Sequence, residues 1–109
     1  MPGSSDIALG NVSYMFLLQG ALTPAQVNTI TAPEQTFTVN GLLVGDFVQV
    51  MKPSAQAGLG IAGARVTAPD TLGITYVNPT AGNITPTAET YIILVIRREN
   101  PNGLPTAIV

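Results

Sequence analysis

The segment TYIILVIRR, residues 90–98, is the strongest indication of the fold class in this sequence. It places apolar side chains at six consecutive positions, from Tyr91 to Ile96. Successive side chains of a strand point to opposite sides of the sheet, so a run of this kind predicts a strand covered on both faces. We expect either the central strand of a sheet or a strand whose outer face meets a partner.

Other segments alternate with the period of two that is typical of half-buried strands. They are QTFTVNG (35–41), DFVQVMKP (46–53) and TLGITYVNP (71–79), and in the last of them Leu72, Ile74 and Tyr76 share one face. Eleven glycines and nine prolines supply turn signals between these segments. The pattern predicts an all-β sandwich or barrel of about six to eight short antiparallel strands.

Two segments leave room for a helix. Residues 12–22, VSYMFLLQGAL, lack a break until Gly20, and they form the one window that could hold a long helix. In TPAQVNTI, residues 23–30, Thr23 could cap a helical turn that begins at Pro24.

The composition of the 109 residues limits both the size of the protein and its chemistry. The length fits one domain. Cysteine and histidine are absent from the sequence, which excludes disulfides, thiolate metal sites, cysteine nucleophiles and a histidine base. Only 9% of the residues are charged, so we expect partners to cover much of the surface. The net charge of −2 argues against nucleic-acid binding.

The two ends of the chain differ from its middle. We expect an N-terminal arm over residues 1–11, a β-sandwich over 12–98 and an extended C-terminal arm over 99–109. The start of the sequence lacks the basic region of a signal peptide, and the apolar run YMFLL is too short to span a membrane. We therefore expect neither a signal peptide nor a membrane partner.

The segment AGLGIAGAR, residues 57–65, matches the dinucleotide fingerprint at Gly58, Gly60 and Gly63. That fingerprint needs a following helix, but the next residues are rich in β-branched side chains and include Pro69. We interpret the three glycines instead as close-packing positions, against the backbone of this chain or of a neighbour. The following residues then predict a hairpin with Ala68-Pro69-Asp70 at its turn.

Candidate chemistry is sparse elsewhere in the sequence. Asp46 and Asp70 lie in predicted turns and do not suggest a catalytic pair, and no acidic cluster suggests a metal. We therefore predict no catalytic residues, no metal and no cofactor. The tyrosines could form a sugar-stacking platform, but Tyr76 and Tyr91 fall in phase with the core.

The candidate contact residues lie at the C-terminal end of the chain. The cluster Arg97-Arg98-Glu99 is either the solvated end of the last strand or an ion-pairing group for a partner. The apolar end of the sequence adds Leu104, Ile108 and Val109, on an arm that docks on a neighbour or folds back on its own sandwich. We expect deletion of residues 100–109 to lower oligomer stability or virion occupancy and to leave the β fold intact.

Three segments together resemble a family of known proteins. TFTVNGLLVGDFVQVMKPS, AGLGIAGARVTAPDTLGITYVNPTAG and TPTAETYIILVIRR, all within residues 36–98, are similar to the head decoration or cement proteins of tailed bacteriophages. The resemblance implies a jelly-roll-like sandwich, a dimer or trimer, and a position outside a capsid shell.

Within the virion, the resemblance implies a non-enzymatic protein, made in the host cytoplasm, that clamps neighbouring subunits of the major capsid protein. The alternative is a tail-fibre piece or a glycan-binding β-sandwich module. That alternative predicts an exposed aromatic patch.

Overall fold

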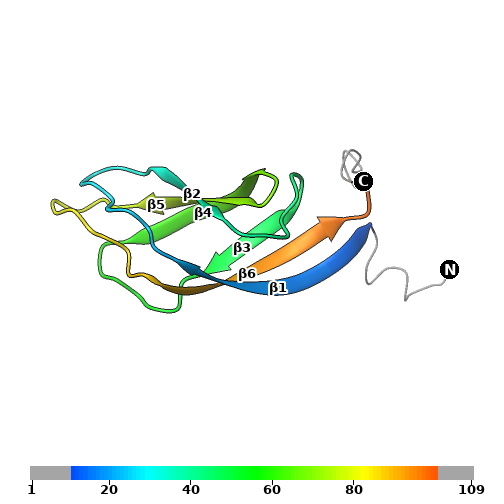
Figure 1. The fold of residues 1–109 in the computed structure, drawn as a ribbon. Helices are drawn as coiled ribbons and strands as arrows, with labels where there is room; N and C mark the ends of the chain where they lie inside the picture. Colours follow the sequence, from blue (N-terminus) through cyan, green and yellow to red (C-terminus); the bar gives the residue numbers. More distant parts are fainter. Residues whose placement is uncertain (1–10, 101–109) are drawn as a thin grey trace.

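A computed structural model describes residues 11–100 of the chain. These residues form six strands, namely β1 (Val12–Leu22), β2 (Glu34–Thr38), β3 (Phe47–Met51), β4 (Gly60–Ala68), β5 (Thr71–Val77) and β6 (Glu89–Arg98). The strands pair antiparallel in two three-stranded sheets, ordered β1-β6-β3 and β2-β5-β4 (Figure 1). Residues 11–100 contain no helix. The prediction of an all-β chain of about six to eight antiparallel strands is confirmed, with six strands among the described residues.

The strands pair in a nested order. The first strand pairs with the last, β1 with β6, and the second with the last but one, β2 with β5. Along the chain β1, β2, β3 and β4 alternate between the two sheets, and β3 and β4 come close to each other at one side of the molecule. The sheets thus form two layers that enclose one core.

Strand β6 is the central strand of its sheet, as the run of apolar residues predicts. Tyr91, Ile93 and Val95 point toward the other sheet and are fully buried. The alternate residues, from Ile92 to Ile96, lie on the outer side and remain partly exposed. One side of the run is therefore covered by the chain itself, and the other side is not covered by any described residue.

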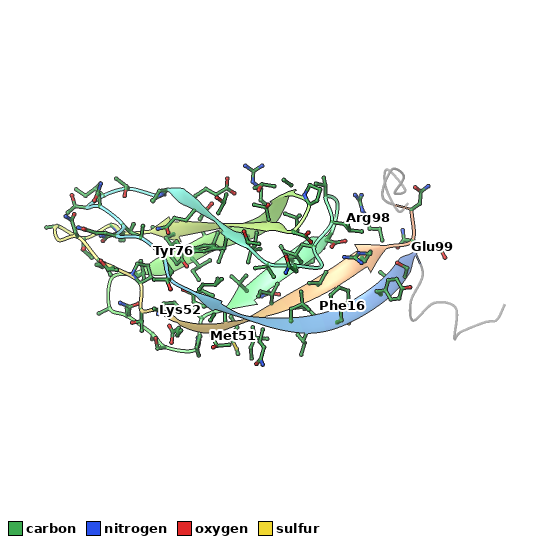
Figure 2. The ribbon with its side chains drawn as sticks, viewed as in Figure 1. Phe16, Met51, Lys52, Tyr76, Arg98 and Glu99 are labelled. Atoms are coloured by element: carbon green, nitrogen blue, oxygen red, sulfur yellow. The ribbon has the colours of Figure 1, made fainter. Side chains whose placement is uncertain are left out.

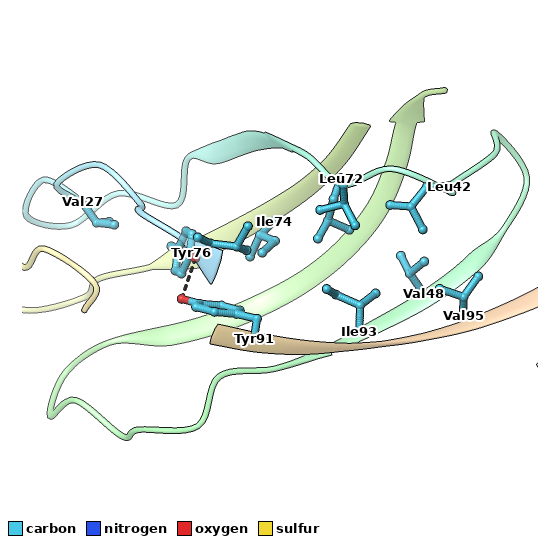
Figure 3. Packing of buried hydrophobic residues seen from close by; sticks show 11 residues of the cluster. Val27, Leu42, Val48, Leu72, Ile74, Tyr76, Tyr91, Ile93 and Val95 are labelled. Atoms are coloured by element: carbon cyan, nitrogen blue, oxygen red, sulfur yellow. Dashed lines mark hydrogen bonds between the residues drawn. The ribbon is translucent and has the colours of Figure 1, made fainter. Parts of the chain in front are cut away.

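The core fills the space between β5 and β6. Leu72, Ile74 and Tyr76 of β5 are all fully buried on one face, as the alternation of that segment predicts. Figure 3 shows these side chains facing those of β6, with the hydroxyl of Tyr76 directed toward that of Tyr91. Burial of large apolar side chains supplies most of the favourable free energy of such a fold.

Neither of the two segments that leave room for a helix is helical. Residues 12–22 form strand β1, and residues 23–30 contain no helical turn. Val27 in the second segment is fully buried and exchanges backbone hydrogen bonds with Ile84 in a distant loop. Long-range pairing with β6 and with Ile84 has outweighed the local preference, which is a weak determinant for short segments.

The predicted hairpin is present. β4 and β5 pair antiparallel around the turn at Ala68-Pro69-Asp70. Asp70 adopts a positive φ of 58°, a conformation that aspartate tolerates better than most residues. Its Oδ1 accepts a hydrogen bond of 2.8 Å from the N–H of Gly41, so the turn is anchored to the loop that leads toward β3.

Candidate binding surface

The outer side of the β1-β6-β3 sheet is the most apolar exposed surface among the described residues. Strand register places three residues from each strand in a grid of three rows. We call this grid the apolar face, and it consists of Met15, Ile96 and Phe47, then Leu17, Leu94 and Gln49, then Gln19, Ile92 and Met51. Seven of its nine positions are apolar, where an antiparallel sheet that faces water usually presents polar side chains.

The side chains of the apolar face are accessible. Leu17 is 67% exposed, Phe47 is 62% exposed and Met15 is 61% exposed. Met51 lies on the side of the sheet turned away from Tyr76 (Figure 2). A shallow hollow of about 480 Å³ lies among Leu17, Gln49, Met51, Ile92 and Leu94, and its lining is largely apolar. Contiguous apolar patches of this kind mark interaction sites on proteins.

The outer side of the other sheet is polar. Threonines dominate this threonine face, which consists of Glu34, Thr36 and Thr38 from β2, Thr71, Gly73 and Thr75 from β5, and Gly63, Arg65 and Thr67 from β4. The two sides of this sandwich therefore differ in their chemistry.

An ion pair crosses the threonine face. Nε and Nη2 of Arg65 donate hydrogen bonds of 2.8 and 2.9 Å to the two carboxylate oxygens of Glu34. This contact lowers the pKa of Glu34, chiefly through the hydrogen bond from Arg65. The carboxylate lies above Gly73, where an added Cβ would stand 2.6 Å from Oε2 of Glu34. Arg65 is therefore a salt-bridged strand residue.

A second ion pair joins the loop before β3 to the end of β6. Nε and Nη2 of Arg97 donate hydrogen bonds of 2.9 and 2.8 Å to the carboxylate of Asp46, whose side chain is only 3% exposed. Burial alone would raise the pKa of Asp46, but the hydrogen bonds from Arg97 and from the N–H of Leu43 outweigh it and hold the pKa below its usual range. The guanidinium of Arg97 also lies 5.4 Å from the ring centre of Phe16.

A third ion pair lies at the opposite ends of the same two strands. Nζ of Lys52, just after β3, lies 2.9 Å from Oε2 of Glu89 at the start of β6, and both side chains are largely buried. Hydrogen bonds from Lys52 and Ser54 lower the pKa of Glu89. The β3–β6 pair is thus held by one ion pair at each end.

The structure separates the two arginines that the sequence groups together as partner contacts. Arg97 has an acidic partner within the chain, and a contact with another protein at Arg97 stays a prediction. Arg98 differs, because its Nε is buried without a hydrogen-bond partner in the described part of the chain. A partner contact at Arg98 stays a prediction.

The three glycines of the fingerprint have different surroundings. Gly58 adopts a φ of 82°, and a Cβ at this position would collide with Thr80. Around Gly60 and Gly63 the described residues leave open space for an added Cβ. At Gly58 the close neighbours are the side chains of Thr80 and Ile84, and an approach by the backbone of a neighbour at any of the three glycines stays a prediction.

The other candidate residues from the sequence are the C-terminal contact residues and the tyrosines. Leu104, Ile108 and Val109 lie outside the described residues, as does most of each expected arm. Tyr76 and Tyr91 are in the core, and within residues 11–100 only Tyr14 and Phe47 are strongly exposed aromatic side chains. The same residues contain no cluster of three or more metal-ligating acidic, cysteine or histidine side chains.

Sequence reasoning anticipated one third of the apolar face. The outer side of residues 90–98 was an expected contact surface, and Ile92, Leu94 and Ile96 are its members. Met15 and Leu17 were missed because residues 12–22 were open to a helical interpretation.

The described part of the chain contains no helix that is long and apolar enough to cross a membrane. Comparisons with family models, with curated proteins and with solved structures find no match to this chain.

Proposed function

We propose that this protein is a non-enzymatic structural protein of a phage virion, which attaches to the outside of the capsid through the apolar face. The observation behind this proposal is the contrast between the two outer faces of one sandwich. An apolar face on one side and a threonine face on the other suit a protein that lies on a larger surface with its second side in water.

The strength of attachment follows from the area available. Full burial of one large aliphatic or aromatic side chain contributes about 1.5–3 kcal/mol. The apolar face offers seven such side chains, several of them more than half exposed in the free chain. A patch of this size forms a modest contact, and repetition over a symmetric shell adds avidity to it.

The charges of the chain support the same proposal. Three of its four basic side chains, those of Lys52, Arg65 and Arg97, are engaged in ion pairs within the chain. Little charge is therefore left to direct binding, and apolar contact with the major capsid protein becomes the main source of affinity. A dimer or trimer is part of the same proposal.

The jelly-roll-like form of the sandwich belongs to this proposal as well. A jelly roll has eight strands that pair in nested order across two sheets. What supports a related form here is the nesting of β1 with β6 and of β2 with β5. The described residues provide six strands, so the likeness is to a smaller roll.

The test compares two lysine substitutions on opposite faces. Leu94→Lys places a charge at the centre of the apolar face, and Thr75→Lys places one on the central strand of the threonine face. Both proteins are mixed with empty shells of the major capsid protein encoded in the same genome, and bound copies are counted after sedimentation. We expect Leu94→Lys to weaken binding roughly 10–100-fold, because it places an unpaired charge at the centre of the apolar contact.

Thr75→Lys is the control that distinguishes a loss of the apolar contact from a general effect of an added charge. Thr75→Lys should bind like the wild-type protein, and circular dichroism should show the same β content for all three proteins. Equal binding by wild type and Leu94→Lys would contradict the proposal. Binding to a glycan array, lost in Phe47→Ala, would favour the glycan-binding module instead.

A further inference from the structure

The four edges of the two sheets are not equally protected. β1 and β3 are the edge strands of one sheet, and β2 and β4 are those of the other. An edge strand exposes unpaired N–H and C=O groups, and proteins protect such edges with short strands, charges, prolines or bulges. The chain applies these devices to three of its four edges.

The protected edges are β2, β3 and β4. β2 and β3 have five residues each, and β2 includes Glu34 and follows Pro33. β3 is followed by Lys52 and Pro53, and it lies beside β4. β4 is interrupted by two register shifts and includes Arg65. None of the three is a long, regular template for another strand.

Edge strand β1 has almost no protection. It has eleven residues, and none of them is charged or a proline. Its one register shift lies at the start, between Val12 and Tyr14, and from Tyr14 to Leu22 it pairs with β6 without interruption. Among the described residues, no backbone hydrogen bond outside this pairing involves residues 12–22.

We propose that β1 is a dimerisation edge that pairs antiparallel with β1 of a second copy of this chain. Antiparallel pairing keeps the inner and outer faces aligned only in registers in which even-numbered residues meet even-numbered residues. Centring the pairing on Leu18 places Phe16 opposite Gly20 of the second copy and Leu17 opposite Gln19. In this register Met15 meets Ala21 and Phe16 meets Gly20, so two large side chains lie opposite small ones, while Tyr14 meets Leu22 at the ends of the ladder.

The pairing has two structural consequences. Nine residues from Tyr14 to Leu22 would form a ladder of about 30 Å at the usual rise per residue. The result is a continuous six-stranded sheet, in which the apolar faces of both copies lie side by side. The second copy would also cover a hollow of about 290 Å³ between residues 18–22 of β1 and residues 38–40.

A second copy fits this edge better than a charged peptide does. The edge offers no charge to select a foreign strand, whereas its own sequence satisfies the register and size pattern on both sides. The inference deepens the proposed function by naming the interface of the dimer, and a dimer through β1 forms whether or not the capsid is the partner.

The test uses two glutamines on the same face of the same sheet. Gln19 lies on β1 and Gln49 lies on β3, at the opposite edge, and both are exposed. Sedimentation equilibrium over a dilution series gives the dimer dissociation constant of the wild type, Gln19→Lys and Gln49→Lys. We expect a wild-type dimer that Gln19→Lys weakens roughly tenfold or more, because lysines on a paired edge repel, and that Gln49→Lys leaves unchanged.

Cross-linking checks the register independently of the charge. The sequence contains no cysteine, so introduced cysteines are the only thiols. An equimolar mixture of Leu17→Cys and Gln19→Cys should form a disulfide-linked dimer on mild oxidation, whereas Gln49→Cys alone should not. A monomeric wild type, equal weakening by both lysines, or cross-linking at Gln49 in place of the β1 pair would each overturn the proposal.

Discussion

The hydroxyl oxygens of Tyr76 and Tyr91 lie 2.9 Å apart in the core, one from each sheet. Both side chains are fully buried, and the hydroxyls are hydrogen-bonded to each other. Each tyrosine therefore satisfies the polar atom of the other within an apolar interior. This link connects β5 to β6, the central strands of the two layers (Figure 3).

Removing both of these hydroxyls should cost less than the sum of the two single removals. In Tyr76→Phe the hydroxyl of Tyr91 stays buried without a partner, and we expect a loss of about 1–3 kcal/mol in the free energy of unfolding. Tyr91→Phe should behave alike. The double variant removes both polar groups, so urea denaturation should give a loss smaller than the sum of the single losses. Additive losses would mean that the two hydroxyls do not depend on each other.

The same pair should make the fold sensitive to alkali. Burial raises the pKa of Tyr76 and of Tyr91 above the ordinary value of 10.0. The stability due to a raised pKa is fully present below the unfolded value and is lost as the pH rises above it. We expect the free energy of unfolding to fall above about pH 10, and to fall less steeply in the Tyr76→Phe/Tyr91→Phe variant. Parallel curves for the two proteins would refute this.

The Asp46–Arg97 pair should make the fold sensitive to acid. The pKa of Asp46 is lowered from its ordinary value of 3.8, so its contribution is present above that value and is lost as the pH falls through the folded pKa. Asp46→Asn leaves Arg97 without its counter-charge and should cost about 1–3 kcal/mol at neutral pH. The difference in the free energy of unfolding between the wild type and Asp46→Asn should become smaller below about pH 3.8.

Chemical denaturation at several pH values measures this gap. Glu99→Gln is the matched control, because Glu99 is exposed at the end of β6 and takes part in none of the three ion pairs described above. It should follow the wild type throughout. A gap for Asp46→Asn that stays constant down to acid pH would show that the ion pair is not its cause.

Alanine substitutions should separate the three glycines of the fingerprint. Gly58→Ala introduces strain at a φ of 82° and a collision with Thr80, so it should lower the thermal midpoint. Gly60→Ala and Gly63→Ala have open space and should leave the monomer fold nearly unchanged. A lower midpoint for either of these two in a dilute monomer would contradict the packing described here. Weaker self-association alone would indicate a neighbour at that position.

The local sequence pattern was sufficient to predict those strands that have one apolar face and one polar face. The alternation of Leu72, Ile74 and Tyr76 predicted β5, and all three are fully buried. The pattern did not identify residues 12–22 as a strand, because their side chains are largely apolar on both faces and show no clear alternation with a period of two. Pairing with β6, more than sixty residues away in sequence, decides that this segment is a strand.

The ion pairs and the apolar face were harder to predict than the strands, because they depend on contacts between residues that are distant in sequence. Asp46 and Arg97 are 51 residues apart, and no local spacing links them. The sequence grouped Arg97 with Arg98, and only the fold shows that Arg97 is already paired within the chain. The apolar face likewise draws on β1, β3 and β6, so it emerges only once the order of the strands is known.

Protection of two methionines tests attachment through the apolar face in the wild-type protein itself. Met15 and Met51 lie on the apolar face and are 61% and 53% exposed, while Ile30 is 76% exposed in a loop away from that face. Hydroxyl-radical labelling followed by mass spectrometry compares the free protein with the protein bound to capsid shells. We expect binding to protect Met15 and Met51 and to leave Ile30 reactive. Equal labelling of both methionines in the free and bound protein would contradict attachment through the apolar face.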